Sequence, residues 1–120
     1  MHQDYEFDGH RYRIHKLGLG DAKVCLAQLS TMGFFELGLT ALMSSADQLN
    51  TLEDQLFRKN CEFENAEGEW VPLGAKVVEG HFSGRLPAYY SVMVKAIKVN
   101  FDDFLDAGWT TALSDQETQG

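Results

Sequence analysis

The dipeptide Asp8-Gly9 constrains the fold of this chain more than any other local feature. A two-residue type I′ turn needs positive φ at both central positions, and Asp-Gly is one of the pairs that adopt it most readily. Folding the chain at this turn places aromatic and aliphatic side chains on one face and opposite charges on the other. The sequence therefore predicts a β-hairpin over residues 4–16, with the pairs Phe7–His10, Glu6–Arg11, Tyr5–Tyr12 and Asp4–Arg13.

A short amphipathic helix is expected directly after this hairpin. Gly18-Leu19-Gly20 should end the strand, and Asp21 can cap the helix that follows. Apolar residues then recur at helical spacing up to about Ser30, and Cys25 falls among them. We therefore expect Cys25 on the buried face of this helix.

The next segment, residues 32–43, is unusually apolar for its length and contains two glycines. It is too rich in apolar residues for a single stripe that faces a single core, so it predicts either a buried helix or a helix with apolar surface on two sides. Ser45 should then cap a more polar helix over residues 46–59, with its inward-facing positions at Leu49, Leu52, Leu56 and Phe57.

The second half of the chain predicts another hairpin and a long helix. Phe63 and Trp70 flank a polar, Gly-containing connection, and Pro72 would confine the later strand to a sheet edge. The pattern over residues 76–82 is ambiguous. Pro87 suits the first turn of a helix, and the most regular helical stripe of the chain follows from there, although Asn100 could break it: Leu86, Tyr90, Met93, Ile97, Phe101 and Phe104.

These elements together predict an α+β fold: an N-terminal β-hairpin, several amphipathic helices, a second short hairpin and a long C-terminal helix. With 120 residues, of which 44% are hydrophobic and 23% charged, the chain suits one globular domain. We expect that domain over residues 1–109 and a mobile polar tail over residues 110–120. Lacking a membrane-length apolar run and a signal-peptide pattern, the chain is expected in the cytoplasm, with free thiols and no membrane partner.

The charge balance bears on the class of partner. Ten Lys and Arg stand against eighteen Asp and Glu, which gives a net charge of −8 and argues against nucleic acid as a partner. An alternative follows from the same charge, because a stripe of acids could occupy the DNA-binding groove of another protein. The chain would then be an acidic protein-binding inhibitor or nucleic-acid mimic from a mobile element, and the stripe would comprise Glu53, Asp54, Glu62, Glu64, Glu67 and Glu69.

The residues that could support catalysis or metal binding do not form a recognisable constellation. His10 and His15 are five positions apart on a predicted strand, so their side chains face opposite sides of the hairpin. Cys25 lies on an apolar stripe, where a structural thiol is the usual occupant. We therefore expect no enzymatic activity, no metal site and no cofactor.

Large apolar side chains are numerous for a domain of this size. We expect those of residues 32–43, together with Phe101, Phe104, Leu105 and Trp109, to exceed what 120 residues can enclose. Surplus apolar surface on helices is typical of a protein-binding groove or an oligomer interface. The sequence therefore favours a binding protein that could also self-associate.

The closing helix and the opening hairpin carry a family resemblance. Residues 81–87 read HFSGRLP and lead into a helix that ends in Asn100-Phe101-x-x-Phe104. This segment resembles the end of the tail assembly chaperones of long-tailed phages and prophages, whose last helix closes on Asn-Phe-x-x-Phe. The hairpin over residues 5–14 and the helices after it resemble the start of that family. Leu105 departs from the pattern, since a further aromatic is common there.

The resemblance implies a non-enzymatic function in the cytoplasm of the host cell. Such chaperones bind the tape measure protein, a very long helical chain with hydrophobic stretches, while the tail tube polymerises around it, and they are absent from the mature virion. In many phages a programmed frameshift adds an extension that recruits the tail tube protein. For this chain we expect Phe34, Phe35, Leu39 and Met43 to face the client, and Phe101 and Phe104 to anchor the last helix in the core.

Overall fold

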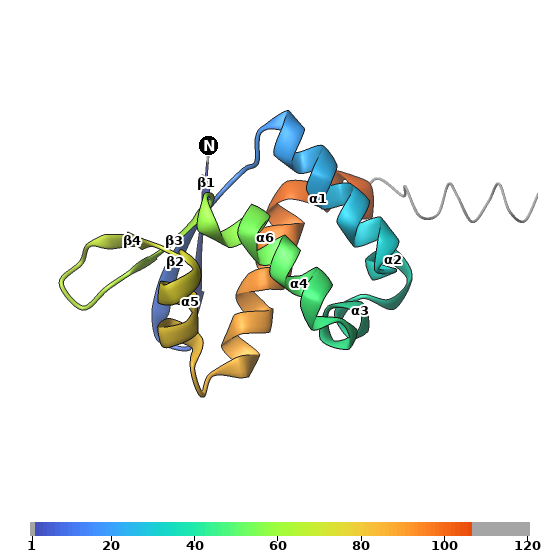
Figure 1. Cartoon of the computed structure of the whole chain (residues 1–120). Coiled ribbons are helices and arrows are strands. Elements are labelled where there is room, and N and C mark those ends of the chain that lie inside the picture. The colour runs from blue at the N-terminus through green and yellow to red at the C-terminus, as the bar shows by residue number, and fades with distance from the viewer. Residues whose placement is uncertain (1, 107–120) are drawn as a thin grey trace, which may run out of the picture.

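Two antiparallel hairpins form a four-stranded sheet at one side of the protein (Figure 1). The computed structural model describes the backbone of residues 2–106 and the side chains of residues 2–102. Asp8 and Gly9 both have positive φ, 54° and 78°, as the turn prediction requires. The strands pair in the order β1 (His2–Phe7), β2 (His10–His15), β3 (Cys61–Glu64) and β4 (Trp70–Pro72), and the register of β1 with β2 is the predicted one.

The second hairpin places Pro72 on an outer strand, as predicted. β4 pairs only with β3, so the missing N–H of Pro72 leaves no gap in the interior of the sheet. The Asn65 side chain holds the connecting loop, because its Oδ1 accepts hydrogen bonds from the backbone N–H groups of Glu67 and Glu69 at 3.0 and 2.8 Å. The backbone pairing of β3 with β2 brings the two hairpins into one sheet.

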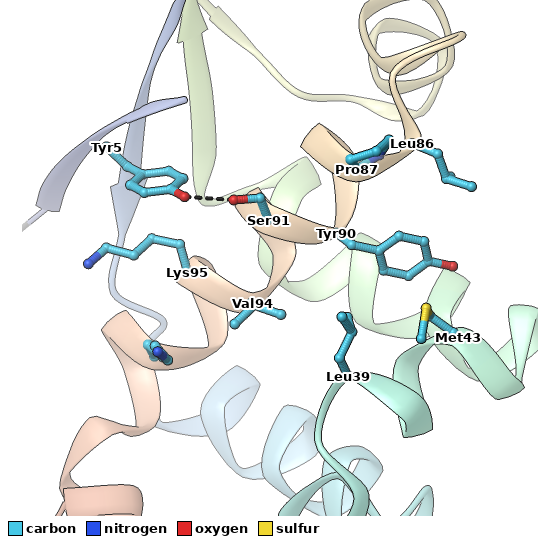
Figure 2. A pocket seen from close by; sticks show the side chains of 10 residues that line it. Tyr5, Leu39, Met43, Leu86, Pro87, Tyr90, Ser91, Val94 and Lys95 are labelled. Carbon is cyan, nitrogen blue, oxygen red and sulfur yellow. Dashed lines mark hydrogen bonds between the residues drawn. The ribbon is translucent and has the colours of Figure 1, made fainter. Parts of the chain in front are cut away.

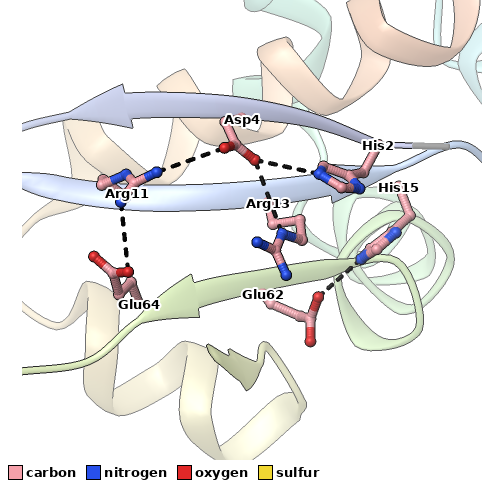
Figure 3. Close-up of polar contacts among 7 residues, drawn as sticks. All are labelled: His2, Asp4, Arg11, Arg13, His15, Glu62 and Glu64. Carbon is pink, nitrogen blue, oxygen red and sulfur yellow. Dashed lines mark hydrogen bonds and ion pairs between the residues drawn. The ribbon is translucent and has the colours of Figure 1, made fainter. Parts of the chain in front are cut away.

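The two faces of this sheet differ in character. Tyr12, Ile14 and Cys61 are buried on one face, and two helices, α5 (Ala75–Phe82) and α6 (Leu86–Asp106), contact strand β2 on this side of the sheet. The opposite face is polar, as Figure 3 shows, and its side chains form ion pairs: His2, Asp4, Arg11, Arg13, His15, Glu62 and Glu64. Alternation along the strands therefore separates core from solvent, as in most antiparallel sheets with one covered face.

The first helix, α1 (Leu19–Thr31), starts three residues earlier than predicted. Gly18 occupies the N-cap position with an extended backbone, and Asp21 lies inside the first turn instead of capping it. An acid in the first turn still favours the helix because it faces the positive end of the helix dipole. Cys25 is fully buried, which confirms the predicted inward face.

The apolar segment forms two short helices instead of one. Gly38 adopts φ 59° and ψ −131°, a conformation that ordinary residues avoid, and this separates α2 (Phe34–Leu37) from α3 (Leu39–Ser44). The backbone conformation of Gly38 therefore interrupts the helix, although the composition of the segment suits a continuous one.

The following helix agrees with its predicted span but not with its predicted cap. It comprises α4 (Ala46–Glu53) and a π-helical continuation, η1 (Asp54–Arg58), and the Ser45 side chain makes no capping hydrogen bond. All four of its predicted inward-facing side chains are buried: Leu49, Leu52, Leu56 and Phe57.

The ambiguous segment before the last helix is itself the helix α5. α6 follows and lies between the sheet and the helices α1 to α4 (Figure 1), so its buried side contributes Val92, Met93 and Ile97 to the centre of the core. The expected disturbance near Asn100 is present as a kink at Phe101, which has φ −127° and ψ 17°, after which the helix resumes.

These elements confirm the α+β prediction, with its opening hairpin, helices, short second hairpin and long last helix. Among the helices of residues 2–106, none combines the length and apolarity that crossing a bilayer requires. The expected polar tail over residues 110–120 lies outside the described residues.

Candidate partner-binding groove

An apolar groove of about 700 Å³ lies between α3 and the N-terminal part of α6, from Leu86 to Lys98 (Figure 2). Leu39 and Met43 come from α3 and face Tyr90 and Val94 of α6 across it. Tyr5 of β1 closes one side. The complete lining is Tyr5, Leu39, Met43, Leu86, Pro87, Tyr90, Ser91, Val94, Lys95 and Lys98.

The spacing along α6 explains why one of its faces is free to line the groove. Met93 and Ile97 point into the core and are fully buried, whereas Leu86, Tyr90 and Val94 recur every four residues on another side. Leu86 is 62% exposed. The first part of the helical stripe predicted from the sequence therefore leaves the core and lines the groove.

The break at Gly38 determines how α3 presents its side chains. Ala41 and Leu42 are buried, while Leu39 and Met43, one turn apart, remain 44% and 56% exposed. A continuous helix from residue 34 onward would carry these residues in a different direction. The break at Gly38, with its positive φ, thus produces the second apolar face that the composition predicted.

A hydrogen bond fixes the strand side of the groove. The Tyr5 hydroxyl and Ser91 Oγ lie 2.6 Å apart, which ties β1 to the N-terminal part of α6 (Figure 2). The Lys95 ammonium lies 5.7 Å from the centre of the Tyr5 ring, within the range of a cation–π contact. Lys98 is exposed beyond it. The groove therefore has an apolar floor and a cationic end.

The four residues expected to face a partner are placed differently from one another. Leu39 and Met43 line the groove, but Phe34 is only 7% exposed and packs in the core. Phe35 is half-buried, and its ring lies edge-to-face with the Phe34 ring, with 5.8 Å between the ring centres. Phe34 is thus a core residue in this conformation, and the surface proposed below does not include it.

The motif residues have structural positions that the resemblance did not specify. Asn100 Oδ1 accepts a hydrogen bond from the backbone N–H of Leu17 at 2.7 Å, and its Nδ2 donates to the Ala96 carbonyl at 3.0 Å. Asn100 therefore fastens α6 to the connection between β2 and α1. Phe101 is buried at the kink, as expected of an anchor, and the side chain of Phe104 lies outside the described residues.

Sequence reasoning missed the contribution of α6 to this surface. Leu86, Tyr90 and Val94 were assigned to the core stripe or not considered, because a stripe predicts an apolar face without saying what covers it. The signal was present in the width of the pattern: α6 is apolar on two adjacent sides, and one core can cover only one of them.

The histidines form packing and hydrogen-bonding contacts. His81 Nε2 lies 2.8 Å from the Tyr12 hydroxyl, and the His81 ring stacks on Phe63 at 4.1 Å. Burial, with help from the nearby Arg85, lowers the pKa of His81 to about 4. His10 lies beside His81, while His15 is on the other face of the sheet, as alternation predicts. Among the described side chains, no group of three potential ligands is arranged to hold a metal ion.

The cysteines are free and buried. Burial raises the pKa of the Cys25 thiol to about 12 and also raises the pKa of Cys61. A thiol is nucleophilic as its thiolate, so neither environment favours nucleophilic chemistry.

Several members of the acidic stripe are occupied within the protein. Glu62 Oε1 lies 2.8 Å from His15 Nε2, and Glu64 Oε2 lies 3.5 Å from a guanidinium nitrogen of Arg11 (Figure 3). Glu53 accepts a hydrogen bond from Tyr89 at 2.8 Å. These contacts weaken the mimicry hypothesis, because part of the stripe is already paired with cationic or hydrogen-bonding groups of the same chain.

Comparisons of the chain with models of protein families, with curated proteins and with solved structures find no match. The family resemblance therefore stays a hypothesis. The groove itself, with its apolar lining and its two lysines, is the feature of the described residues from which a function can be argued.

Proposed function

We propose that this chain is a non-enzymatic tail assembly chaperone of a long-tailed phage or prophage. Its client would be the tape measure protein, whose apolar helices would pack into the groove between α3 and α6. The observation that carries this proposal is the open apolar groove: a protein with no partner gains nothing from leaving Leu39, Met43 and Leu86 in water.

The energetics of the groove suit a chaperone. Full burial of a Leu or Met side chain contributes roughly 1.5–3 kcal/mol, and these three side chains are about half exposed, so each has about 1 kcal/mol still to gain. A few such contacts hold an apolar helix without making its release slow. The flexible thioether of Met43 also tolerates partners of varied shape.

The same proposal places the protein in the host cytoplasm and outside the mature virion. A client with many apolar stretches would be covered by many copies, and contacts between neighbouring copies could make a homo-oligomer along it. A longer, frameshifted form would recruit the tail tube protein. The net charge of −8 would keep copies with open grooves soluble before they meet the client.

The test is co-expression with the proposed client, a tape measure protein. We expect the soluble fraction of the client to rise several-fold with the wild-type chain. It should fall back towards the level without chaperone for Leu39→Asp and Met43→Asp, because a carboxylate in the groove must lose its water when the client binds. The far-UV circular dichroism of both variants should match that of the wild type.

Leu19→Asp is the matched control. Leu19 is 76% exposed but lies at the start of α1, away from the groove lining. This variant should solubilise the client as well as the wild type does. Equal activity of all three variants would refute the groove as the client site, and a client that stays insoluble with the wild-type chain would refute the chaperone function.

A further inference from the structure

The groove has a length and direction that select for a helix. Its lining on α6 extends from Leu86 to Lys98, thirteen residues, or about 18 Å at the helical rise. This distance matches a little over three turns of a partner helix lying along α6. The apolar side chains occupy the end nearest Leu86, and the lysines occupy the other.

The charge of the groove is opposite to that of the whole chain. The chain has a net charge of −8, yet the lining contains two lysines and no acid. Lys95 and Lys98 are three positions apart, so they project from neighbouring turns of one helix. Within residues 2–102, neither ammonium group forms an ion pair with a carboxylate.

We infer that the groove binds a specific class of helix, namely an amphipathic helix with acidic residues at one end of its apolar stripe, which Lys95 and Lys98 would hold. The inference rests on the proposed function and specifies the client segment that the groove selects. Apolar residues of the partner would cover Met43 and Tyr90. Lys95 and Lys98 are nine and twelve positions from Leu86. One or two carboxylates of the partner would therefore lie about 9–12 residues from the partner's apolar residue that contacts Leu86.

This arrangement gives the groove both affinity and selectivity. Burial of apolar surface would stabilise the binding of any helix with an apolar face, whereas the lysines would attract an acidic helix end and repel a basic one. Lys95 is the stronger determinant, because its half-buried position over the Tyr5 ring is less screened by water than that of the exposed Lys98. The affinity for an acidic-ended helix should therefore fall as the salt concentration rises, and the fall should be small because only two lysines take part.

The test uses fluorescein-labelled peptides and the full chain. One eighteen-residue peptide has an apolar stripe at helical spacing and two glutamates at one end; a second has lysines in place of those glutamates. Anisotropy should show the acidic-ended peptide binding the wild type roughly tenfold more tightly than the basic-ended one. The double variant K95E/K98E should reverse that preference.

The matched control is K23E/K76E, which changes the net charge by the same amount. Lys23 on α1 and Lys76 on α5 are exposed and lie outside the groove. This variant should retain the wild-type preference. The inference is wrong if K95E/K98E also retains the preference for the acidic-ended peptide, or if K23E/K76E loses that preference to the same extent. In either case Lys95 and Lys98 do not determine which peptide binds.

Two further results separate this inference from the function on which it rests. A client that is solubilised equally by wild type and K95E/K98E, with no difference between the two peptides, would leave the chaperone function standing and overturn the acidic-end selectivity. A wild-type dimer that Met43→Asp converts to a monomer in sedimentation would assign the groove to a second copy of the chain, and would overturn the inferred occupant.

Discussion

Replacing Asn100 with alanine should destabilise the protein through one backbone group. The Leu17 N–H, which donates to Asn100 Oδ1 at 2.7 Å, would lose its acceptor in a half-buried position. An unsatisfied donor costs about 1–3 kcal/mol, and partial access of water to Leu17 favours the lower half of that range. The Nδ2 bond to the Ala96 carbonyl adds little, because that carbonyl is already part of the helix. We therefore expect a loss of about 1–2 kcal/mol.

Urea unfolding followed by far-UV circular dichroism measures this loss. For a domain of this size it corresponds to a midpoint roughly 1 M lower and a Tm about 5–10 °C lower. Asn100→Asp retains an acceptor for the Leu17 N–H and should lose less than Asn100→Ala. Asn50→Ala, on an exposed face of α4, should stay within about 0.5 kcal/mol of the wild type. An Asn100→Ala variant as stable as the wild type would refute the reasoning.

Three other predictions follow from buried or strained groups. Burial lowers the pKa of His81 to about 4, so the folded state favours the neutral ring; the free energy of unfolding should fall as the pH drops from about 6.5 to 4, and His81→Gln should flatten that dependence in urea titrations at pH 4.5, 5.5 and 7.5. Parallel profiles would contradict the assignment. Cys25 and Cys61 are buried with raised pKa values, so a thiol reagent at pH 8 should label neither in the native protein and both in urea; rapid labelling of the native protein would contradict this. Gly38→Ala should lower the free energy of unfolding by about 1–3 kcal/mol because of the positive φ of Gly38, whereas Gly20→Ala inside α1 should raise it by about 0.5 kcal/mol; thermal unfolding distinguishes the two signs.

Local chemistry made the strands predictable. The Asp8-Gly9 turn permits one register, and that register satisfies both faces of the hairpin at once, so the pairing of Tyr5 with Tyr12 followed from the sequence. Pro72 could likewise be placed on an edge strand, because proline lacks the backbone N–H that a central strand donates to its neighbour. These features depend on neighbours in sequence and not on tertiary contacts.

The helices were less predictable because their boundaries depend on backbone conformation and packing. The positive φ of Gly38 divides a segment whose composition alone suits one continuous helix. The Asp21 side chain could have capped α1, but the helix begins at Leu19, where Gly18 supplies an extended N-cap.

The groove was predicted in kind but only partly in its residues. An excess of apolar side chains indicated a second apolar surface, and Leu39 and Met43 do line one. Phe34 was assigned to that surface, yet it packs inside, because helical spacing alone does not say which of two apolar faces the core will cover. The contribution of α6 to the groove could be recognised only from the structure, because α3 and α6 are distant in sequence and only the fold brings them together.

Site-specific photocrosslinking tests the central claim, that the groove between α3 and α6 receives a helix of another polypeptide. A benzophenone side chain would replace Leu86 in the groove or Leu19 on α1, and the chain would be irradiated while co-expressed with the tape measure protein. The two positions are comparably exposed, at 62% and 76%. We predict client adducts from position 86 and none from position 19. Equal adducts from both positions, or adducts from position 19 alone, would contradict the claim.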